Sequence, residues 1–384
     1  MMKLKKDTIV AFLALVPFFE PTYVSTLPLS GIIYDIYKIL LFIILLFCFI
    51  LFKKRIKASL LLVLLSEFSI FVFTIFNKGL FNYELKNLLS LISLVFLIHL
   101  YSEKFNTLLN ALMLHFEICI YTNLMTLILF PERLFGRYVA AYGYTFEWFL
   151  GPRNSFINWL LPGLVIALLY RTYNRKSYRW RVLIGAIIAT QIFQTSSTLL
   201  VSSTIFLTLI LVPCLNSFFK PMICFFVSLV VQFIIVILND VDFLAPIIEG
   251  VLGKDLTFTN RTMIWENAVS NINLKGYGVL DPIKVASKLG NFGDYVWVGA
   301  THAHDQLLNL AFQGGFISLF LTILIYFVDF KKLEIFWESL NARILAFALF
   351  SYIVSGYTEV TNNLLLQLIV ILPLFIENLV NAEK

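Results

Sequence analysis

Residues 301–326 read THAHDQLLNLAFQGGFISLFLTILIY, and this stretch decides the class of the chain. From Leu307 onward it is mainly apolar for about twenty residues, which is long enough for a helix to cross a bilayer. Two of the four histidines, His302 and His304, stand directly before it together with Asp305. The stretch therefore predicts a transmembrane helix with a candidate proton acceptor at the membrane surface.

A second polar segment begins at Arg261, and its apolar residues recur at the spacing of an amphipathic helix. These residues are Ile264, Trp265, Ala268 and Val269. One solvent-side region thus carries both a fixed cation and an imidazole. That combination suits a phosphate-bearing substrate, because guanidinium groups bind phosphate and a neutral imidazole accepts a proton.

The composition of the whole chain also indicates a membrane protein. Of its 384 residues, 60% are hydrophobic and only 14% are charged, and the mean hydropathy is +0.87. Because a soluble domain has about 25% charged residues, we predict an all-α, polytopic membrane protein. The net charge of +6 does not indicate nucleic-acid binding, since the cations are scattered through short loops instead of gathered on one face. The four cysteines lie in apolar stretches without CxxC spacing, which favours neither disulfides nor a metal site.

We predict about twelve transmembrane helices within one membrane domain of residues 1–384. Prolines interrupt the first of them, and almost no turn separates the seventh from the eighth. The long segment 239–303 is then a large extracytoplasmic loop between the ninth and tenth spans. The spans lie near 8–28, 36–52, 58–76, 85–101, 106–130, 154–170, 182–196, 198–218, 221–238, 305–328, 342–358 and 362–380.

The positions of Lys and Arg predict the orientation, because basic residues in short loops are retained in the cytoplasm. The N-terminal lysines, KKRIK at 53–57 and RTYNRKSYRWR at 171–181 all fall on one side of a twelve-span chain. We therefore expect a multi-pass protein of the plasma membrane with both termini in the cytoplasm. The segments 131–153 and 239–303 then face outward.

Three arginines in the outward segment 131–153 run against this charge rule. Contact with lipid headgroups is a sufficient explanation for Arg133. Arg137 and Arg153 lie in GRYVAAYGYTFEWFLGPRNSF, residues 136–156. For these two we favour a bidentate grip on a phosphate or a carboxylate.

The arrangement of these segments resembles the O-antigen ligase and Wzy-type polysaccharide polymerase superfamily of bacterial envelope proteins. Gly151-Pro152-Arg153-Asn154, at the start of the sixth span, is similar to the family's G-x-[PR]-N element. Arg137 stands upstream of it, where the family usually has an arginine. The predicted span number and the large loop before the tenth span also fit the family.

Two further elements follow in the family's order. Arg261-Thr262-Met263-Ile264-Trp265, followed by Gly276-Tyr277-Gly278, resembles G-R-T-x-I-W … G-x-G, with Asn260 in place of the first glycine. His302-Ala303-His304-Asp305, followed by Gly314-Gly315, resembles H-A-H-N … G-G-x-x-G. Asp305 replaces the usual Asn, and Ser318 replaces a usual Gly. Because a neighbouring carboxylate raises the pKa of an imidazole, we expect Asp305 to tune the base.

The resemblance implies glycosyl transfer on the outer leaflet. The donor would be a polyprenyl-diphosphate-linked oligosaccharide and the acceptor a growing polysaccharide, with a flippase and a chain-length regulator as protein partners. We predict His304 as the base and Arg261 as the catalytic cation. The remaining predicted substrate-binding residues are Arg153, Arg137, Asn154, His302 and Asp305.

This chemistry needs no cofactor, because arginines can stabilise the leaving diphosphate and an imidazole can take the proton. Asp240 and Asp242 form a D-V-D at the head of the large loop, which we interpret as the end of a span rather than as a metal site. Glu67 and Glu117 lie deep in predicted spans. Each either lines a substrate path or is neutralised within the bundle.

Other functions are compatible with parts of this pattern. A ligase would transfer the glycan to a different acceptor, but the Lys-, Ile-, Asn- and Phe-rich composition is typical of low-GC Gram-positive bacteria, which lack a lipid A core. A transporter of lipid-linked sugars would suit the intramembrane charges and the proline-broken helices, yet the sequence halves show no repeat. A non-catalytic scaffold leaves the outward arginines unexplained. We therefore favour the polymerase.

Overall fold

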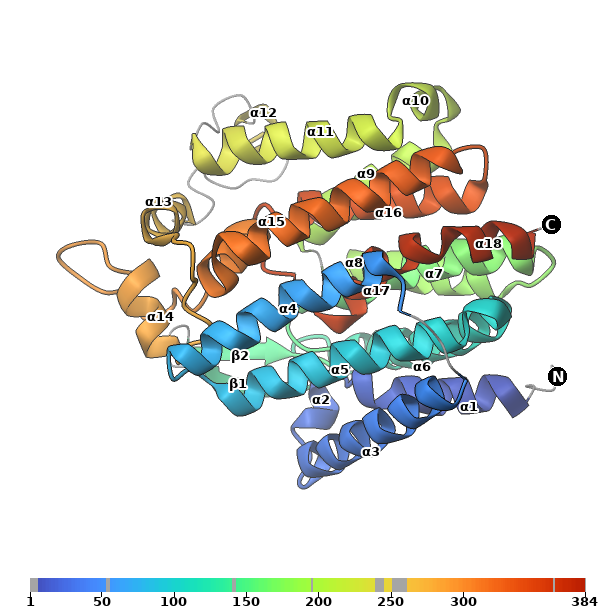
Figure 1. Ribbon diagram of the computed structural model, residues 1–384, viewed down its shortest axis with the longest axis horizontal. Helices are drawn as coiled ribbons and strands as arrows, with labels where there is room; N and C mark the ends of the chain where they lie inside the picture. The colour runs from blue at the N-terminus through green and yellow to red at the C-terminus, as the bar shows by residue number, and fades with distance from the viewer. Residues whose placement is uncertain are drawn as a thin grey trace.

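The computed structural model describes residues 6–52, 56–139, 143–194, 196–238, 245–250, 261–361 and 363–383. It is mostly helical, and its long helices run side by side along one direction (Figure 1). The start of α1 (Lys6–Leu15) and α18 (Ile376–Glu383) lie at the right-hand end of this view, whereas α13 (Arg261–Asn271) and α14 (Pro282–Leu289) lie at the other end. Helices α13 and α14 are thus placed far from both ends of the described chain.

In chain order, the remaining elements are η1 (Val16–Phe18), α2 (Thr22–Ser25), α3 (Ser30–Leu51), α4 (Ala58–Phe76), α5 (Phe81–Leu100), η2 (Ser102–Lys104), α6 (Phe105–Leu129), β1 (Phe135–Val139), β2 (Gly143–Glu147), η3 (Arg153–Phe156), α7 (Ile157–Tyr173), α8 (Arg179–Phe193), α9 (Ser197–Leu211), α10 (Pro213–Phe218), α11 (Pro221–Gln232), the π-helical η4 (Phe233–Ile237), α12 (Ala245–Ile248), α15 (Gln306–Ile335), α16 (Leu340–Ser355), α17 (Leu364–Ile371) and η6 (Leu372–Phe375).

Seven helical segments in the described ranges are long and apolar enough to cross a membrane. They are Ser30–Leu51, Ala58–Phe76, Phe81–Leu100, Ser102–Leu129, Arg153–Tyr173, Gln306–Ile335 and Leu364–Asn381, and three shorter apolar helices are Ser197–Leu211, Pro221–Ile237 and Leu340–Ser355. This supports the predicted class, a helical membrane protein. It leaves the number twelve as a prediction.

The first predicted span is not one helix. The segment 8–28 is divided into α1, η1 and α2, and α1 ends at Leu15 just before Pro17. Proline lacks the amide hydrogen that a helix interior needs and its ring clashes with the preceding turn. The prolines that weakened this prediction therefore shorten the helix to ten residues.

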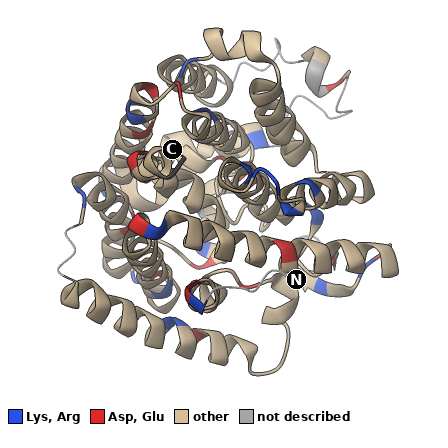
Figure 2. Cartoon of the chain, turned by 90° about the vertical axis from the view of Figure 1, so that its right-hand side faces the viewer, with Lys and Arg blue, Asp and Glu red and all other residues tan. Residues whose placement is uncertain are grey.

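Helix α3 shows how the outer surface suits a bilayer. Most of its large side chains face outward, including Ile33 (61% exposed), Phe47 (61%) and Ile50 (64%). An exposed apolar surface of this length promotes aggregation in water, whereas it is normal for a helix that faces lipid. Charged residues occupy only short patches of the ribbon in Figure 2, which views the end that carries both termini.

The most extensive contact between two helices in the described residues joins α4 and α15. The Ser66 hydroxyl lies 3.0 Å from the Ser318 hydroxyl and 3.1 Å from that of Thr322. Small side chains let two membrane helices approach closely, and hydroxyl pairs add polar contacts that lipid cannot replace. Ser318 therefore has a structural role at this contact.

The glycine pairs of the second and third motif elements meet each other in the fold. Helix α15 is broken at Gly315, whose φ is 64°. This break leaves the carbonyls of Phe312 and Gln313 free to accept hydrogen bonds from Tyr277 N (2.8 Å) and Gly278 N (2.7 Å). A Cβ at Gly278 would lie 2.3 Å from the backbone of Thr74. These glycines let the loop at 276–278 pack against α15 and α4. They therefore fix the position of the loop relative to the first half of α15.

One element departs from the predicted all-α fold. Strands β1 and β2 form an antiparallel hairpin in which Arg137 lies opposite Thr145. Tyr138 and Tyr144, on adjacent strands, are 66% and 70% exposed, with ring centroids 5.5 Å apart. Alternating aromatic and polar residues favour a strand pair. The segment 131–153 is thus partly β-structure in its described residues.

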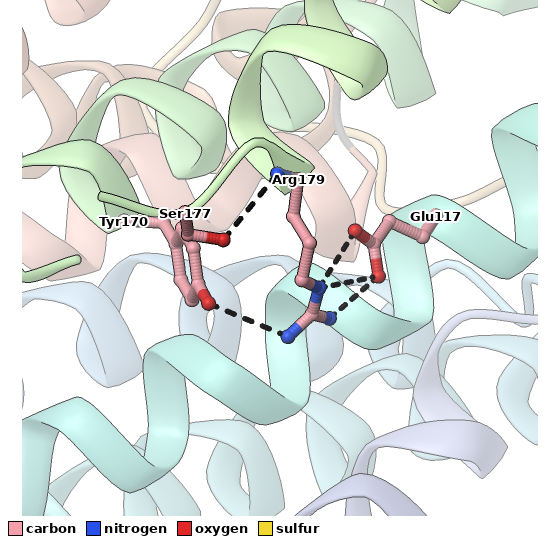
Figure 3. A network of polar contacts seen from close by, with 4 residues as sticks. All are labelled: Glu117, Tyr170, Ser177 and Arg179. Carbon is pink, nitrogen blue, oxygen red and sulfur yellow. Dashed lines mark hydrogen bonds and ion pairs between the residues drawn. The ribbon is translucent and has the colours of Figure 1, made fainter. Parts of the chain in front are cut away.

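Glu117 forms an ion pair inside the bundle, which decides between its two predicted roles. Arg179, the first residue of α8, donates from Nε to Oε1 (2.9 Å) and from Nη2 to Oε2 (2.5 Å) of Glu117 on α6 (Figure 3). Nη1 also donates to the Tyr170 hydroxyl at 3.4 Å. Glu117 is therefore neutralised by pairing, and the pair fastens α6 to α8.

We predict that Arg179→Ala destabilises the protein. The substitution leaves the Glu117 carboxylate buried without its cation, which costs about 3–5 kcal/mol in buried pairs. Thermal unfolding in detergent should therefore shift to a lower temperature. Arg181→Ala on the same helix, where the guanidinium instead lies over the Tyr178 and Trp180 rings, is the control and should shift it much less. Equal stability of wild type and Arg179→Ala would contradict a structural role for the pair.

Candidate functional site

The candidate site lies at the end of the bundle opposite α18, where three segments distant in sequence converge. These are the start of α13, the turn before α15, and the loop 356–363 between α16 and α17. Arg261, the first residue of α13, donates from Nη1 to the carbonyl of Thr358 and from Nη2 to Glu359 Oε1 at 2.9 Å. Its side chain is 19% exposed. The predicted amphipathic helix exists: Ile264, Trp265 and Ala268 are buried, whereas Val269, predicted on the same face, is 38% exposed.

The two histidines of the turn lie against each other. Their ring centroids are 4.0 Å apart, and the His304 ring stacks on Trp297 at 6.5 Å. His304 has a φ of 53°, a left-handed conformation that is uncommon for a residue other than glycine. Neither ring nitrogen of this buried side chain has a hydrogen-bond partner among the described residues. Such strain and an unpaired buried donor and acceptor are typical of functional positions.

Burial and neighbouring cations keep both imidazoles neutral. Burial, and to a smaller extent His302 and Arg261, lower the pKa of His304 to about 2. Burial, and then the Arg261 charge, lower the pKa of His302 to about 4. A neutral imidazole is the form that accepts a proton. Protonation of either ring is unfavourable, mainly because burial withdraws the ring from water.

The predicted influence of Asp305 on His304 is wrong. Asp305 Oδ1 accepts a hydrogen bond from Leu308 N at 2.7 Å, and Oδ2 accepts one from Gln232 Nε2 at 2.6 Å. Asp305 is the N-cap of α15 and is fully buried. Its carboxylate therefore satisfies the first turn of the helix, and the pKa of His304 is lowered instead of raised.

The sequence reasoning missed Glu359. Gln306, next to Asp305, fixes the loop that carries it, because Gln306 N donates to Gly356 O and its side-chain oxygen accepts from Thr361 N, both at 2.7 Å. These two bonds hold the loop on the turn of the histidines and place Glu359 against Arg261. The available signal was a single carboxylate in the short outward connection between the last two predicted spans.

A groove of about 820 Å³ contains two more of the predicted residues. Arg153 and Asn154, both exposed in η3, line it together with Arg133, Glu132, Trp148 and Gln194. The preceding turn is held by Asn123 Oδ1, which accepts from Leu150 N at 3.0 Å. Gly151 has a φ of 111° and contacts Thr22 closely, so the G-P-R-N element is a tight turn that presents Arg153.

Arg137 lies outside the lining of this groove. Its Nε is 3.0 Å from Oε1 of the buried Glu147, and 57% of its side chain is exposed. The ion pair crosses the hairpin and stabilises it. Arg137 is therefore separated from Arg153, whereas Arg133, for which headgroup contact seemed sufficient, shares the groove with Arg153.

One hydroxyl contact links α9 to the loop that binds Arg261. Gln194 lines the groove, and Thr198 lies four residues later in the first turn of α9. The Thr198 hydroxyl is 3.5 Å from that of Thr358, whose backbone carbonyl accepts from Arg261. Helix α9, which begins close in sequence to Gln194 of the groove lining, thus contacts the loop that binds Arg261.

Several residues singled out in the sequence lie outside this site or outside the described residues. Asp240, Asp242 and Asn260 lie outside the described residues. Within the described ranges, no group of three or more His, Cys, Asp or Glu side chains could hold a metal ion. Glu67 lies inside the bundle, 9% exposed, where it lines a cavity of about 30 Å³ that also contacts Gln306. That volume holds about one or two waters, so it is no path for a sugar.

Together these features define a helical membrane protein with a basic and imidazole-containing site at one end. Comparison of the chain with protein-family models, with curated proteins and with solved structures found no match. The assignment of an activity therefore rests on the residues and their geometry.

Proposed function

We propose that this protein is a membrane glycosyltransferase that polymerises oligosaccharide repeat units. Its donor is a polyprenyl-diphosphate-linked oligosaccharide, and its acceptor is a hydroxyl of the growing polysaccharide. The observation that carries the proposal is the convergence of Arg261 with His302 and His304. Arg261 lies close enough to lower the pKa of both rings although its helix begins far upstream in sequence.

The reaction assigns one task to each group. The acceptor hydroxyl oxygen forms a bond to the anomeric carbon of the donor, and the bond from that carbon to the diphosphate oxygen breaks. His304 accepts the hydroxyl proton, and polyprenyl diphosphate leaves with the bonding electron pair. Arg261 stabilises the negative charge that develops on the leaving oxygens, as fixed cations do in sites of low dielectric.

The electrostatics of the free site fit this sequence of events. With Arg261 nearby and the ring buried, His304 is a weak base. A bound diphosphate brings negative charge next to both groups, which favours the imidazolium and so raises the pKa of His304. The base therefore becomes effective only when the donor is present.

The groove provides the place for the remainder of the donor headgroup. Arg153 and Arg133 supply positive charge, and Trp148 and Phe146 supply aromatic surface in the same lining. A volume of about 820 Å³ lies within the usual range for small-molecule sites, about 300–1,000 Å³. We assign Arg153 and Asn154 to binding of the donor. Arg137 acts through the hairpin that borders the groove.

The orientation is part of the proposal. The start of α1 and α18 lie at one end of the bundle and the site at the other, as an even number of passes requires (Figure 1). The clusters of Lys and Arg in short loops favour a cytoplasmic location for the termini. The site then faces the outer side of the plasma membrane, with twelve passes, and a flippase and a chain-length regulator act with it.

Two other functions give different products in one experiment. The glycans and lipid-linked intermediates of a deletion strain should be analysed, with the leaflet of each intermediate determined. Loss of a polymerase leaves single repeat units on lipid in the outer leaflet. Loss of a transporter traps them in the inner leaflet, and loss of a ligase leaves full-length polymer on lipid. Either of the last two results would reject polymerisation.

A further inference from the structure

In the Arg261–Glu359 ion pair, a carboxylate already binds the guanidinium that the proposed reaction needs. Arg261 Nη2 lies 2.9 Å from Glu359 Oε1, and the two side chains are only 19% and 20% exposed. In the part of the chain that the structure describes, Glu359 is the one carboxylate paired with Arg261. A diphosphate that binds this guanidinium must therefore compete with a carboxylate that is already in place.

We propose that Glu359 is an internal competitor of the diphosphate, which holds Arg261 in the free protein and is displaced when the donor binds. Glu359 is thus a positioning residue that sets the affinity of the site for anions. The assignment of a diphosphate as the natural ligand rests on the proposed function, whereas the competition itself rests on the ion pair alone.

The loop that carries Glu359 makes displacement feasible without loss of Arg261. Gln306 holds the loop at Gly356 and at Thr361, on both sides of Glu359. The second bond of Arg261 goes to the backbone carbonyl of Thr358 and carries no net charge. When Glu359 moves away, this bond still orients the guanidinium, and the donors that faced Glu359 become free.

Charge favours the exchange. A guanidinium has five N–H donors in a fixed fork, and phosphate oxygens match that geometry as well as a carboxylate does. A diphosphate carries more negative charge than one carboxylate, and His302 and His304 stand beside the same cation. A ligand with a single negative charge, in contrast, gains little over Glu359. The pair thereby selects for diphosphates over simple carboxylates.

The test measures the binding of inorganic pyrophosphate to the purified full-length protein by calorimetry. Glu359→Gln keeps an oxygen that accepts from Arg261 but removes the competing charge. We expect the variant to bind pyrophosphate about tenfold more tightly, which is modest for a close charge pair. Glu338→Gln, an exposed position beyond the end of α15, changes the net charge equally and should bind as wild type does.

A purely structural role of Glu359 predicts the opposite change in pyrophosphate affinity. If the pair only held Arg261 in place, Glu359→Gln would bind pyrophosphate more weakly than wild type. Weaker or unchanged binding therefore overturns the proposal. Should Glu359→Gln fail to fold, Glu359→Asp keeps the charge on a shorter side chain, and its affinity should lie above that of wild type.

The outcome separates this inference from the proposed function. Tighter pyrophosphate binding in a protein that forms no polymer would leave the competition intact and reject the transferase. Polymer formation that depends on Arg261, with unchanged binding in Glu359→Gln, would reject the competition alone.

Discussion

Replacement of His304 by alanine is expected to lower polymer formation by roughly 10²–10⁴-fold, the usual contribution of a general base. His304 is the buried member of the histidine pair, it has no hydrogen-bond partner among the described residues, and it stacks on Trp297. The nitrogen of the neutral ring that carries no hydrogen therefore has no internal donor that competes with the proton of an acceptor hydroxyl. The glycan ladder of a deletion strain that expresses the variant measures the effect.

His302→Ala is the matched control, because it removes a similar ring from the same turn. His302 is more exposed than His304, and its Nδ1 lies 3.1 Å from the Thr301 hydroxyl. We expect this variant to keep partial activity, with both variants inserted in the membrane at wild-type amounts. Opposite phenotypes would transfer the role of base to His302. Full-length polymer from both variants would exclude a histidine base.

Arg261→Lys should lose most of the activity, on the order of 10²–10³-fold, the effect of removing one donor to a developing oxyanion. The charge is retained, but an ammonium cannot reproduce the fork that bonds Thr358 O and still reaches a second oxygen. The rate of transfer from a lipid-linked donor measures this loss.

Arg181→Lys is the control for the arginine substitution. Its guanidinium lies over the Tyr178 and Trp180 rings on α8, outside the groove and the Arg261 cluster, and it has no assigned part in the reaction. We expect a small effect there. Near-normal transfer by Arg261→Lys would mean that Arg261 only joins α13 to the loop after α16.

The membrane fold was predictable wherever a long apolar stretch decides it alone. The helices at 58–76 and 81–100 follow the predicted limits closely because their ends coincide with polar residues. The hairpin at 135–147 was missed, since aromatic residues near a membrane surface are equally typical of interfacial loops. The strands exist because the two segments pair with each other, which no single segment reveals.

The candidate site was predictable only in its residue types. Arginine and histidine in outward segments indicated phosphate chemistry, and the fold brings Arg261 and the histidines together. The role of Asp305 was predicted wrongly because adjacency in sequence does not reveal where a side chain points. At a helix start, the N-cap bond to Leu308 N takes precedence. Glu359 was missed because its pairing depends on a contact between α13 and a loop almost a hundred residues later.

The central claim is that this chain itself forms a glycosidic bond, and reconstitution tests it most directly. The purified protein is placed in proteoliposomes with a polyprenyl-diphosphate-linked oligosaccharide, and the products are separated by length. We predict products of two or more repeat units with release of polyprenyl diphosphate, both absent when His304→Ala replaces the wild-type protein. Movement of intact donor across the bilayer with no new bond, in a folded wild-type protein, would contradict the account.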